Sequence, residues 1–270
     1  ISSFKHILSE NTDKKLGDKL SAAERKQVGD SLVGYDISPD MTRMSLVNMY
    51  LHQFASPLIH EYDTLSSEDR WNEYYDVILA NPPFFSPTGG IQPHSRFGVQ
   101  STRAEVLFTN YIIEHLKPNG RAGIIVPEGI IFQNGTAYKT LRKQLVEDCL
   151  VGVISLPAGV FQPYSNVKTS ILILDKELNQ KTDSIFFAKI ENDGFSLGTQ
   201  RTLIQQNDLP QVIDDFNKTL HSLDNESSDY LILKSEILQN PSVMLTSGLY
   251  KPAQTVTSNW EMVELQKIIS

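Results

Sequence analysis

The stretch Asp76–Phe85, which reads DVILANPPFF, is the part of the sequence that decides the fold. Its first half is a short apolar run of the kind that forms a buried strand. Asn81 follows this run, and Pro82 and Pro83 then restrict the backbone at the expected carboxyl end of the strand. Two aromatic residues come next. The stretch therefore predicts a strand that ends in a rigid turn carrying an amide and aromatic rings.

The amide and the rings of this stretch suit recognition of an amino group on a flat ring. The Asn81 side-chain carbonyl and a backbone carbonyl can both accept hydrogen bonds from one –NH₂ group, while Phe84 stacks on the ring that bears it. Accepting both hydrogens concentrates the nitrogen lone pair for attack on an electrophilic methyl group, so that no strong base is needed. In the structural alternative, the prolines close a strand, and Phe84 and Phe85 lie in the core.

Short β-branched runs alternate with helical stretches along most of the chain, a pattern typical of a mostly parallel sheet covered on both faces. We predict strands at Leu32–Ile37, Leu58–Tyr62, Tyr75–Ala80, Gly120–Val126, Val151–Leu156, Ser170–Leu174 and Ile185–Ile190, and helices at Pro39–His52, Arg103–Leu116 and Thr136–Asp148. Such alternation predicts a doubly wound α/β domain, in which ligands bind outside the carboxyl ends of the strands.

Local signals refine this prediction. Ser38 and Pro39 suit the cap and first turn of a helix, and Lys117–Gly120 predicts a turn from a helix into a strand. Residues 82–102 are rich in Pro, Gly, Ser and Phe without a clear period, and a connection of this length is expected to be functional or mobile. Beyond Lys176 the pattern weakens, which indicates an appendage to the sheet domain.

The composition excludes several classes of protein. Among the 270 residues Cys149 is the single cysteine, so no internal disulfide can form and we expect a reducing compartment, the cytoplasm. No apolar run approaches the roughly 20 residues of a membrane span, so no membrane partner is expected. Sequence motifs for zinc binding are missing, so no metal site is expected. The motifs of phosphate-binding loops and of Ser-His-Asp hydrolases are missing as well. A net charge of −8 argues against a stand-alone DNA-binding protein.

The segment Asn81-Pro82-Pro83-Phe84 resembles the signature (Asn/Asp/Ser)-Pro-Pro-(Tyr/Phe/Trp) of amino-directed methyltransferases that use S-adenosylmethionine. Its wider context resembles one branch of them, the modification subunit of type I restriction-modification systems and related fused enzymes that methylate adenine N6 in DNA. The similar segments, in order, are Gly34–Ile37, Met44–His52, Asp63–Leu65, Ala104–Phe108, Gly120–Phe132, Ile154–Lys176 and Asn192–Leu197. Together with the signature they cover most of residues 1 to 250.

The resemblance assigns cofactor-binding roles to three residues. Asp36, at the end of a predicted strand, corresponds to the carboxylate that accepts from the ribose hydroxyls of S-adenosylmethionine. The alternative role for Asp36 is a favourable interaction of its carboxylate with the dipole of the next helix. Asp63 matches the position that contacts the adenine of the cofactor in the family. In the alternative, Asp63 only forms a turn. Ile37 is expected to lie against the adenine ring.

On the substrate side, Asn81, Pro82, Pro83 and Phe84 are the expected catalytic residues. Phe85, Phe161 and Tyr164 are expected to hold a flipped base, with core packing as the alternative for Phe161 and Tyr164. Lys168 is expected to meet DNA phosphates. The nearby basic side chains are those of His94, Arg96 and Arg103, and for this whole basic group a solvated loop is the alternative.

One part of the family pattern is missing from this chain. The family carries an Asp/Asn-Pro-x-x-Gly-x-Gly-Gly-Phe segment after its first strand, where glycine backbone approaches the methionine part of the cofactor. Ile1–Leu8 resembles the helix that follows that loop. The resemblance thus implies a doubly wound, Rossmann-like methyltransferase sheet without its first strand, Gly-rich loop and N-terminal helical domain. We expect the isolated chain to bind the cofactor weakly or not at all.

Three parts are expected along the chain. Residues 1–176 correspond to a partial S-adenosylmethionine-dependent methyltransferase domain, and residues 177–252 to a C-terminal appendage of the modification subunit. Residues 253–270 contain Asn259–Ile269, which resembles the opening of a sequence-recognition (specificity) module. A generic amphipathic end is the alternative for this last part.

The resemblance implies transfer of a methyl group from S-adenosylmethionine to N6 of an adenine flipped out of double-stranded DNA. The implied partners are DNA, a specificity subunit or fused recognition domain, and a restriction subunit. One alternative is methylation of a protein glutamine or of a guanine in RNA, which uses the same signature. The other is a non-catalytic scaffold that docks a recognition subunit. The long loop after the signature and Asp193–Leu197 favour the restriction branch.

Overall fold

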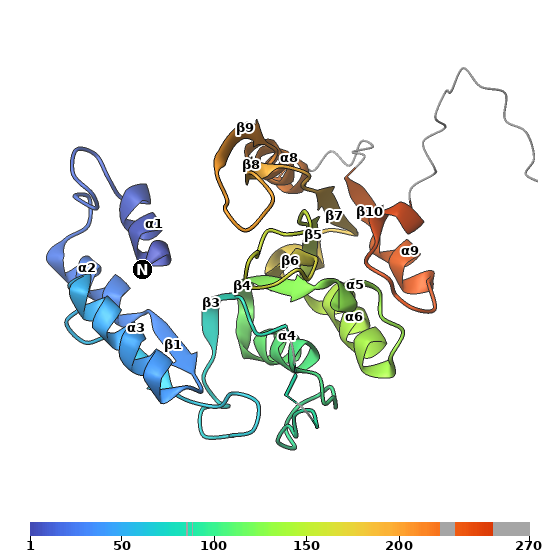
Figure 1. The fold of residues 1–270 in the computed structure, drawn as a ribbon, viewed down its shortest axis with the longest axis horizontal. Coiled ribbons are helices and arrows are strands. Elements are labelled where there is room, and N and C mark those ends of the chain that lie inside the picture. The colour runs from blue at the N-terminus through green and yellow to red at the C-terminus, as the bar shows by residue number, and fades with distance from the viewer. Residues whose placement is uncertain (85, 88, 222–229, 251–270) are drawn as a thin grey trace, which may run out of the picture. The chain divides into compact units, whose positions relative to one another are not determined.

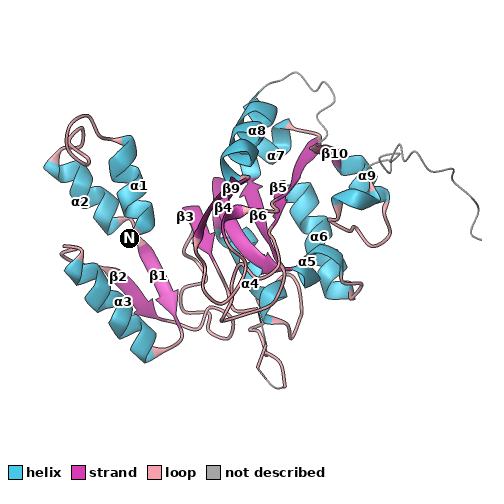
Figure 2. Ribbon diagram, turned by 45° about the horizontal axis from the view of Figure 1, so that its top comes forward, coloured by secondary structure: helices cyan, strands magenta, loops and turns pink. Residues whose placement is uncertain are grey.

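The computed structural model describes residues 1–84, 86, 87, 89–221 and 230–250. The chain divides into two compact units. The first unit comprises Ile1–Tyr75 and Phe85–Lys117, and the second comprises Asp76–Phe84 and Pro118–Ser270. Each unit is built around its own sheet, with helices beside it (Figures 1 and 2).

The first unit contains a pair of parallel strands. Its elements are α1 (Ser2–Glu10), α2 (Ala22–Asp30), β1 (Val33–Asp36), α3 (Pro39–Leu51), β2 (Leu58–Glu61) and α4 (Ala104–His115). β1 and β2 pair in parallel with Asp36 opposite Glu61, and α3 lies along the pair (Figure 2). The Ser38 hydroxyl accepts from the Met41 N–H, and Pro39 is the first helical residue, which confirms the predicted start of this helix.

An aromatic cluster holds the rest of the first unit together. The Trp71 ring lies edge-on to His94 and His115, with centroids 4.4 and 4.6 Å away, and to Phe97 at 4.9 Å. The His115 ring stacks on Tyr111 of the same helix at 3.7 Å. Because these residues come from three separated segments, the cluster fastens the chain before α4 to the helix itself.

The second unit is built on a six-stranded sheet with the order β10-β7-β5-β6-β4-β3. Its strands are β3 (Tyr75–Ala80), β4 (Leu116–Pro127), β5 (Leu150–Ser155), β6 (Thr169–Asp175), β7 (Ser184–Lys189) and β10 (Leu231–Leu233). β5 and β7 are parallel, whereas β6 runs antiparallel to β4 and β5, and β10 runs antiparallel to β7. The predicted α/β class is confirmed. The reversal of β6 and β10 was not predicted from the sequence.

Helices cover this sheet and a hairpin extends it. The helices are α5 (Glu128–Phe132), α6 (Thr136–Asp148), α7 (Lys176–Lys181), α8 (Leu209–His221) and α9 (Lys234–Gln239), followed by a 3₁₀ turn at Ser247–Leu249, and the hairpin consists of β8 (Asp193–Phe195) and β9 (Leu203–Asn207). On β5, a side chain at Gly152 would meet the Phe216 ring of α8 at 2.9 Å, while Val151 and Val153 point the other way and are also buried. β5 is therefore covered on both faces, as predicted.

A fully buried arginine fastens the end of the described chain to this unit. The Arg142 guanidinium donates to the carbonyl oxygens of Ile130 (2.9 Å), Gln133 (2.7 Å), Ser242 (2.7 Å) and Val243 (2.8 Å). Burial lowers its pKa to about 10, so that the side chain is still protonated at neutral pH. Four carbonyl groups from two separated segments are thus satisfied by one side chain.

The predicted elements agree with the structure except at one junction. α4 ends at His115 and β4 begins at Leu116, so the turn predicted at Lys117–Gly120 is wrong and these residues are strand. They precede Arg121, where pairing of β4 with β6 begins. A strand end without that partner accommodates Pro118, which has no N–H to donate.

None of the helices in the described part of the chain has the length and apolar character that crossing a bilayer requires. Within the same residues, no group of three or more His, Cys, Asp or Glu side chains is arranged to hold a metal ion. Phe85 and the Asn259–Ile269 segment, both singled out in the sequence, lie outside the described residues.

Candidate active site

Asn81–Phe84 leaves the end of β3 in the second unit. β3 lies at the edge of the six-stranded sheet and ends at Ala80. The Asn81 side chain is exposed, Pro82 is buried, and Pro83 is exposed. The buried proline anchors the turn to the unit, and the amide next to it is accessible to a ligand.

The strand that leads to this turn is less buried than its apolar sequence predicts. Val77 and Leu79 are 55% and 66% exposed. β3 is an edge strand of the described sheet, with β4 as its one hydrogen-bonded neighbour, so within this unit its side chains pack beside those of only one adjacent strand. The prediction of a strand at Tyr75–Ala80 is confirmed, and the prediction that it is buried is wrong.

Phe84 contacts the loop that follows β5. Its half-buried ring meets the ring of Phe161 edge-on, with centroids 5.6 Å apart and planes at 74°. Tyr164, three residues further along the same loop, is 94% exposed. The structure thus brings Phe161 to the Asn-Pro-Pro-Phe turn and leaves the Tyr164 ring in solvent, so core packing does not account for Tyr164.

Lys168 closes the same loop and carries a partner of opposite charge. Its Nζ lies 3.4 Å from Oε1 of Glu128, which also accepts from the Ser170 hydroxyl at 3.2 Å. The Glu128 N–H donates to the Lys168 carbonyl at 3.1 Å, so both the backbone and the side chains join the loop to the carboxyl end of β4. Glu128 was not singled out in the sequence, although it follows Pro127 at the end of a predicted strand.

The three predicted cofactor residues lie together in the first unit. Asp36 ends β1 and Asp63 follows β2, its parallel neighbour, and the Tyr62 N–H donates to the Asp36 carbonyl at 3.0 Å. Asp36 Oδ1 accepts from the Ser38 N–H at 2.8 Å. Ile37 is 66% exposed. Two carboxylates and an exposed apolar side chain therefore share the carboxyl edge of the β1–β2 pair.

Asp63 also orders its own turn. Its Oδ1 accepts from the N–H groups of Leu65 (3.0 Å) and Ser66 (3.2 Å), and its Oδ2 accepts from the Ser66 hydroxyl. This is the hydrogen bonding expected of a turn former. Each carboxylate oxygen has further acceptor capacity, so the contact with a cofactor adenine stays a prediction.

The donor chemistry of an adenosyl group fits this edge. Ribose hydroxyls and an adenine amino group are hydrogen-bond donors, and they match the acceptor-only oxygens of Asp36 and Asp63. The exposed Ile37 side chain offers an apolar surface for a flat base. The residues present are therefore able to hold the adenosine half of S-adenosylmethionine.

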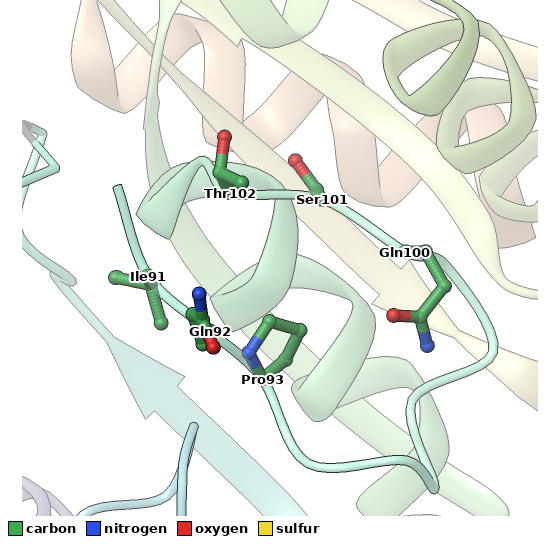
Figure 3. A pocket seen from close by; sticks show the side chains of 6 residues that line it. All are labelled: Ile91, Gln92, Pro93, Gln100, Ser101 and Thr102. Carbon is green, nitrogen blue, oxygen red and sulfur yellow. The ribbon is translucent and has the colours of Figure 1, made fainter. Parts of the chain in front are cut away.

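The long loop after the Asn-Pro-Pro-Phe turn lines an open pocket in the first unit. The pocket has a volume of about 450 Å³ and is lined by Ile91, Gln92, Pro93, Gln100, Ser101 and Thr102, whose side chains are shown in Figure 3. The Ile91 N–H donates to the Thr102 carbonyl at 3.0 Å, which joins the two ends of the loop. Gly90 has a φ of +78°, and a side chain there would meet the Thr102 Cβ at 2.7 Å.

The basic side chains of this loop are engaged within the first unit. The His94 side chain is buried in the Trp71 cluster, and burial lowers its pKa. Arg96 donates to the Asn72 side chain at 2.9 Å and lies over the Trp71 ring. Arg103 is exposed at the start of α4. The structure therefore does not present His94 for a phosphate contact.

Most of the chain is similar to known proteins. Residues 10–256 match the family model described as N-6 DNA Methylase. The chain is 36% identical over 144 residues to the type I restriction enzyme EcoEI methylase subunit of Escherichia coli, covering 52% of this chain and 29% of that protein. It is 30% identical over 182 residues to the StySPI methylase subunit of Salmonella potsdam, covering 65% of this chain and 34% of that protein.

Solved structures share the fold. The EcoKI M protein superimposes with a TM-score of 0.65 at 23% identity, covering 78% of this chain and 45% of that chain. A chain from a type I restriction-modification complex gives a TM-score of 0.69 at 24% identity, covering 98% of this chain and 54% of that chain. This chain thus spans about a third of the length of the two curated relatives and about half of these two structures.

Proposed function

This chain belongs to the N-6 DNA methylase family, and on that basis we propose that it is the methyl-transferring part of a type I modification subunit, which methylates adenine N6 in DNA. The observation that carries the proposal is the exposed Asn81 amide on a buried proline, beside the Phe84 ring that Phe161 supports. The relatives named as type I restriction enzyme methylase subunits support the same function.

The proposed roles follow from the turn at the end of β3. The target adenine leaves the duplex, at a cost of a few kcal/mol, and stacks on Phe84. Its amino group donates to the Asn81 side-chain carbonyl and to the Pro82 carbonyl, and the two prolines restrict the backbone that carries these acceptors. Catalysis then consists mainly of positioning and of a preorganised set of dipoles.

Other substrate contacts come from the loop after β5 and from the turn itself. Phe161 braces Phe84, and the exposed Tyr164 is free to stack on a nucleotide base. Phe85 follows Phe84 in the sequence and is proposed to line the same base site. Lys168 is proposed to meet a DNA phosphate by exchanging its partner Glu128 for that anion.

The cofactor proposed for this reaction is S-adenosylmethionine, which supplies an electrophilic methyl group when bound. Asp36 accepts hydrogen bonds from the ribose hydroxyls, Asp63 accepts from the adenine amino group, and Ile37 covers one face of the adenine. These roles use oxygens and an apolar side chain that share one edge of the β1–β2 pair.

The proposed partners are double-stranded DNA, a subunit or fused domain that recognises the DNA sequence, and a restriction subunit. The relatives bear the names of subunits of type I restriction enzymes, which supports a multi-subunit assembly. The net charge of −8 favours a division of labour, because phosphate contacts of a DNA complex then come mainly from another component.

The experiment that tests this function replaces Asn81 by Ala in the full-length protein that carries this chain, together with its recognition partner. Transfer of a labelled methyl group to cognate DNA is expected to fall on the order of 10²–10³-fold, as for loss of one preorganised polar contact, while DNA affinity stays within a few-fold. The matched control is Asn119→Ala, an exposed asparagine on β4 of the same unit. Retained methylation in the Asn81 variant contradicts the proposal.

The same assay includes three other substrates: DNA without adenine, a glutamine-containing peptide and a ribosomal RNA fragment. Methylation of the peptide or RNA in preference to the cognate DNA overturns the assignment of the substrate. Methylation of adenine-containing DNA alone supports it.

A further inference from the structure

We propose that Arg201 is a positioning residue of the active site, which holds the loop carrying Phe161 against Phe84 by binding the carbonyl of Val160. This inference rests on the proposed function. It concerns residues of the second unit only, and Arg201 was not singled out in the sequence.

The guanidinium of Arg201 has two anchors. Nη1 donates to the Val160 carbonyl oxygen at 2.6 Å, and Nη2 forms an ion pair with the Asp193 carboxylate. The guanidinium also lies over the Phe195 ring, 5.3 Å from its centroid. Its planar fork therefore joins the hairpin β8–β9 to a backbone atom of the loop after β5.

The hairpin is a fixed support. Asp193 lies in β8, and the Asp208 carboxylate beside it accepts from the N–H groups of Glu191 and Asn192, both at 2.8 Å. The Ile190 N–H donates to the Ser155 carbonyl at 2.8 Å, which ties the chain leading into the hairpin to the end of β5. Arg201 thus reaches the loop from a segment that is itself bonded to the sheet.

The loop of residues 157–167 is tied to β4 at its end through Lys168 and Glu128, and to the β8–β9 hairpin at Val160 through Arg201. Its other hydrogen bonds in the described structure are local, from the N–H groups of Gln162, Tyr164, Ser165 and Val167 to residues of the same loop and from the Gln162 side chain to Asn166. Val160 packs its side chain against the core cluster that contains Leu156 and Phe186. With its side chain in the core and its carbonyl on Arg201, Val160 is held at two points, and Phe161 is the next residue.

Arg201 is poorly placed to act on DNA directly. Its side chain is 19% exposed, and the partner carboxylate is 12% exposed. A guanidinium already bonded to a carboxylate and a carbonyl gains little from a phosphate, because it first has to leave both. The arrangement therefore assigns Arg201 to geometry within the protein. Displacement of the loop by even 1 Å is enough to lower a catalytic rate on the order of 10²-fold.

The test compares Arg201→Lys and Arg201→Gln with Arg121→Gln, an exposed arginine on β4 of the same unit. Lysine keeps the charge opposite Asp193 but lacks the fork that reaches both anchors. In hydrogen exchange on the chain itself, the hydrogen-bonded amides of Gln162, Tyr164 and Ser165 are expected to exchange about tenfold faster in both Arg201 variants, and at the wild-type rate in the control. Unchanged exchange in the Arg201 variants overturns the proposal.

Kinetics in the full-length protein separate positioning from DNA contact. We expect kcat to fall up to about tenfold in Arg201→Lys, no more than in removal of the Phe161 ring itself, with KM for DNA and the salt dependence of DNA affinity unchanged. A phosphate-contacting arginine would instead lower the slope of log K against log salt by about one. A lowered slope with an unchanged kcat therefore contradicts the proposal.

A double variant checks that Arg201 acts through Phe161. If it does, adding Arg201→Lys to Phe161→Leu lowers kcat little further, because the second change acts on a contact already lost. If the effects of the two substitutions on kcat multiply, Arg201 does not act through Phe161, and the proposal is contradicted. If the wild-type protein transfers no methyl group to adenine in DNA, the proposed function fails, and hydrogen exchange still decides whether Arg201 holds the loop.

Discussion

The ring of Phe84 meets the ring of Phe161 edge-on, with ring centroids 5.6 Å apart. Phe84 follows the edge strand β3, and Phe161 lies in the loop after β5, three strands further into the sheet. Such aromatic pairs contribute about 0.5–1.5 kcal/mol beyond the area they bury. The contact joins the expected base-binding turn to a second loop of the same unit.

Removal of this contact is expected to impair catalysis more than binding. In Phe161→Ala the Phe84 ring loses its support, and kcat for methylation is expected to fall about tenfold with the affinity for DNA nearly unchanged. Phe132→Ala, at a half-exposed position in α5, is the control and is expected to keep the wild-type rate. An effect confined to KM would show that Phe161 contributes to binding and not to positioning.

Asn substitutions separate the two interpretations of Asp63. Asn keeps an oxygen that accepts from the N–H groups of Leu65 and Ser66, so the turn is expected to survive in Asp63→Asn. The carboxylate is lost, and the affinity for S-adenosylmethionine is expected to fall about 10- to 100-fold, as it is in Asp36→Asn. Calorimetric titration of the full-length protein measures both affinities.

The control for these two variants is Asp69→Asn, an exposed aspartate of the same unit that bonds the Ser67 hydroxyl. Its affinity for the cofactor is expected to match the wild type. An Asp63→Asn variant with full cofactor affinity would leave Asp63 as a turn former alone.

Loss of the buried guanidinium is expected to destabilise the second unit. In Arg142→Met four carbonyl groups lose their donor, and the free energy of unfolding is expected to fall on the order of 3–5 kcal/mol, measured by urea titration. Arg43→Met, an exposed arginine of α3, is the control. A change below about 1 kcal/mol would mean that water replaces the guanidinium at these carbonyls.

The buried histidines make the first unit sensitive to acid. Burial lowers the pKa of both His94 and His115 below the ordinary value, in spite of Glu68 near His94. The unfolded chain therefore binds protons first, and the stability present above about pH 6.5 is lost as the pH falls below that value. The free energy of unfolding, measured by urea titration, is expected to fall as the pH is lowered from about 8 to about 5, a range that spans the ordinary histidine pKa.

Trp71 reports on this loss directly, because its ring contacts both histidines. Its fluorescence can be followed after Trp260→Phe removes the other tryptophan of the chain. In His115→Phe the dependence of stability on pH is expected to become shallower, whereas the exposed His6→Gln control keeps it. An equal dependence in all three proteins would assign the acid sensitivity to other groups.

Comparison of particular helices and strands with their predicted bounds shows which sequence signals were sufficient to predict them. β3 occupies Tyr75–Ala80 and α6 occupies Thr136–Asp148, as predicted, because apolar periodicity and the residues at their ends act over a few positions. The Lys117–Gly120 turn was predicted from its Pro, Asn and Gly. It is strand, and Pro118 is tolerated in it because β4 pairs with β6 only from Arg121 onwards.

The sequence by itself determined the α/β class, the Asn81–Phe84 turn at the end of a strand, and the membership of the methylase family, because these depend on local order along the chain. The tertiary structure alone decided that β6 runs against its neighbours and that Arg201 reaches Val160. It also decided that Phe161 rather than Tyr164 meets Phe84. The reason is that these relationships join residues far apart in the sequence, and their energies depend on which strands pair and which loops meet at the sheet edge.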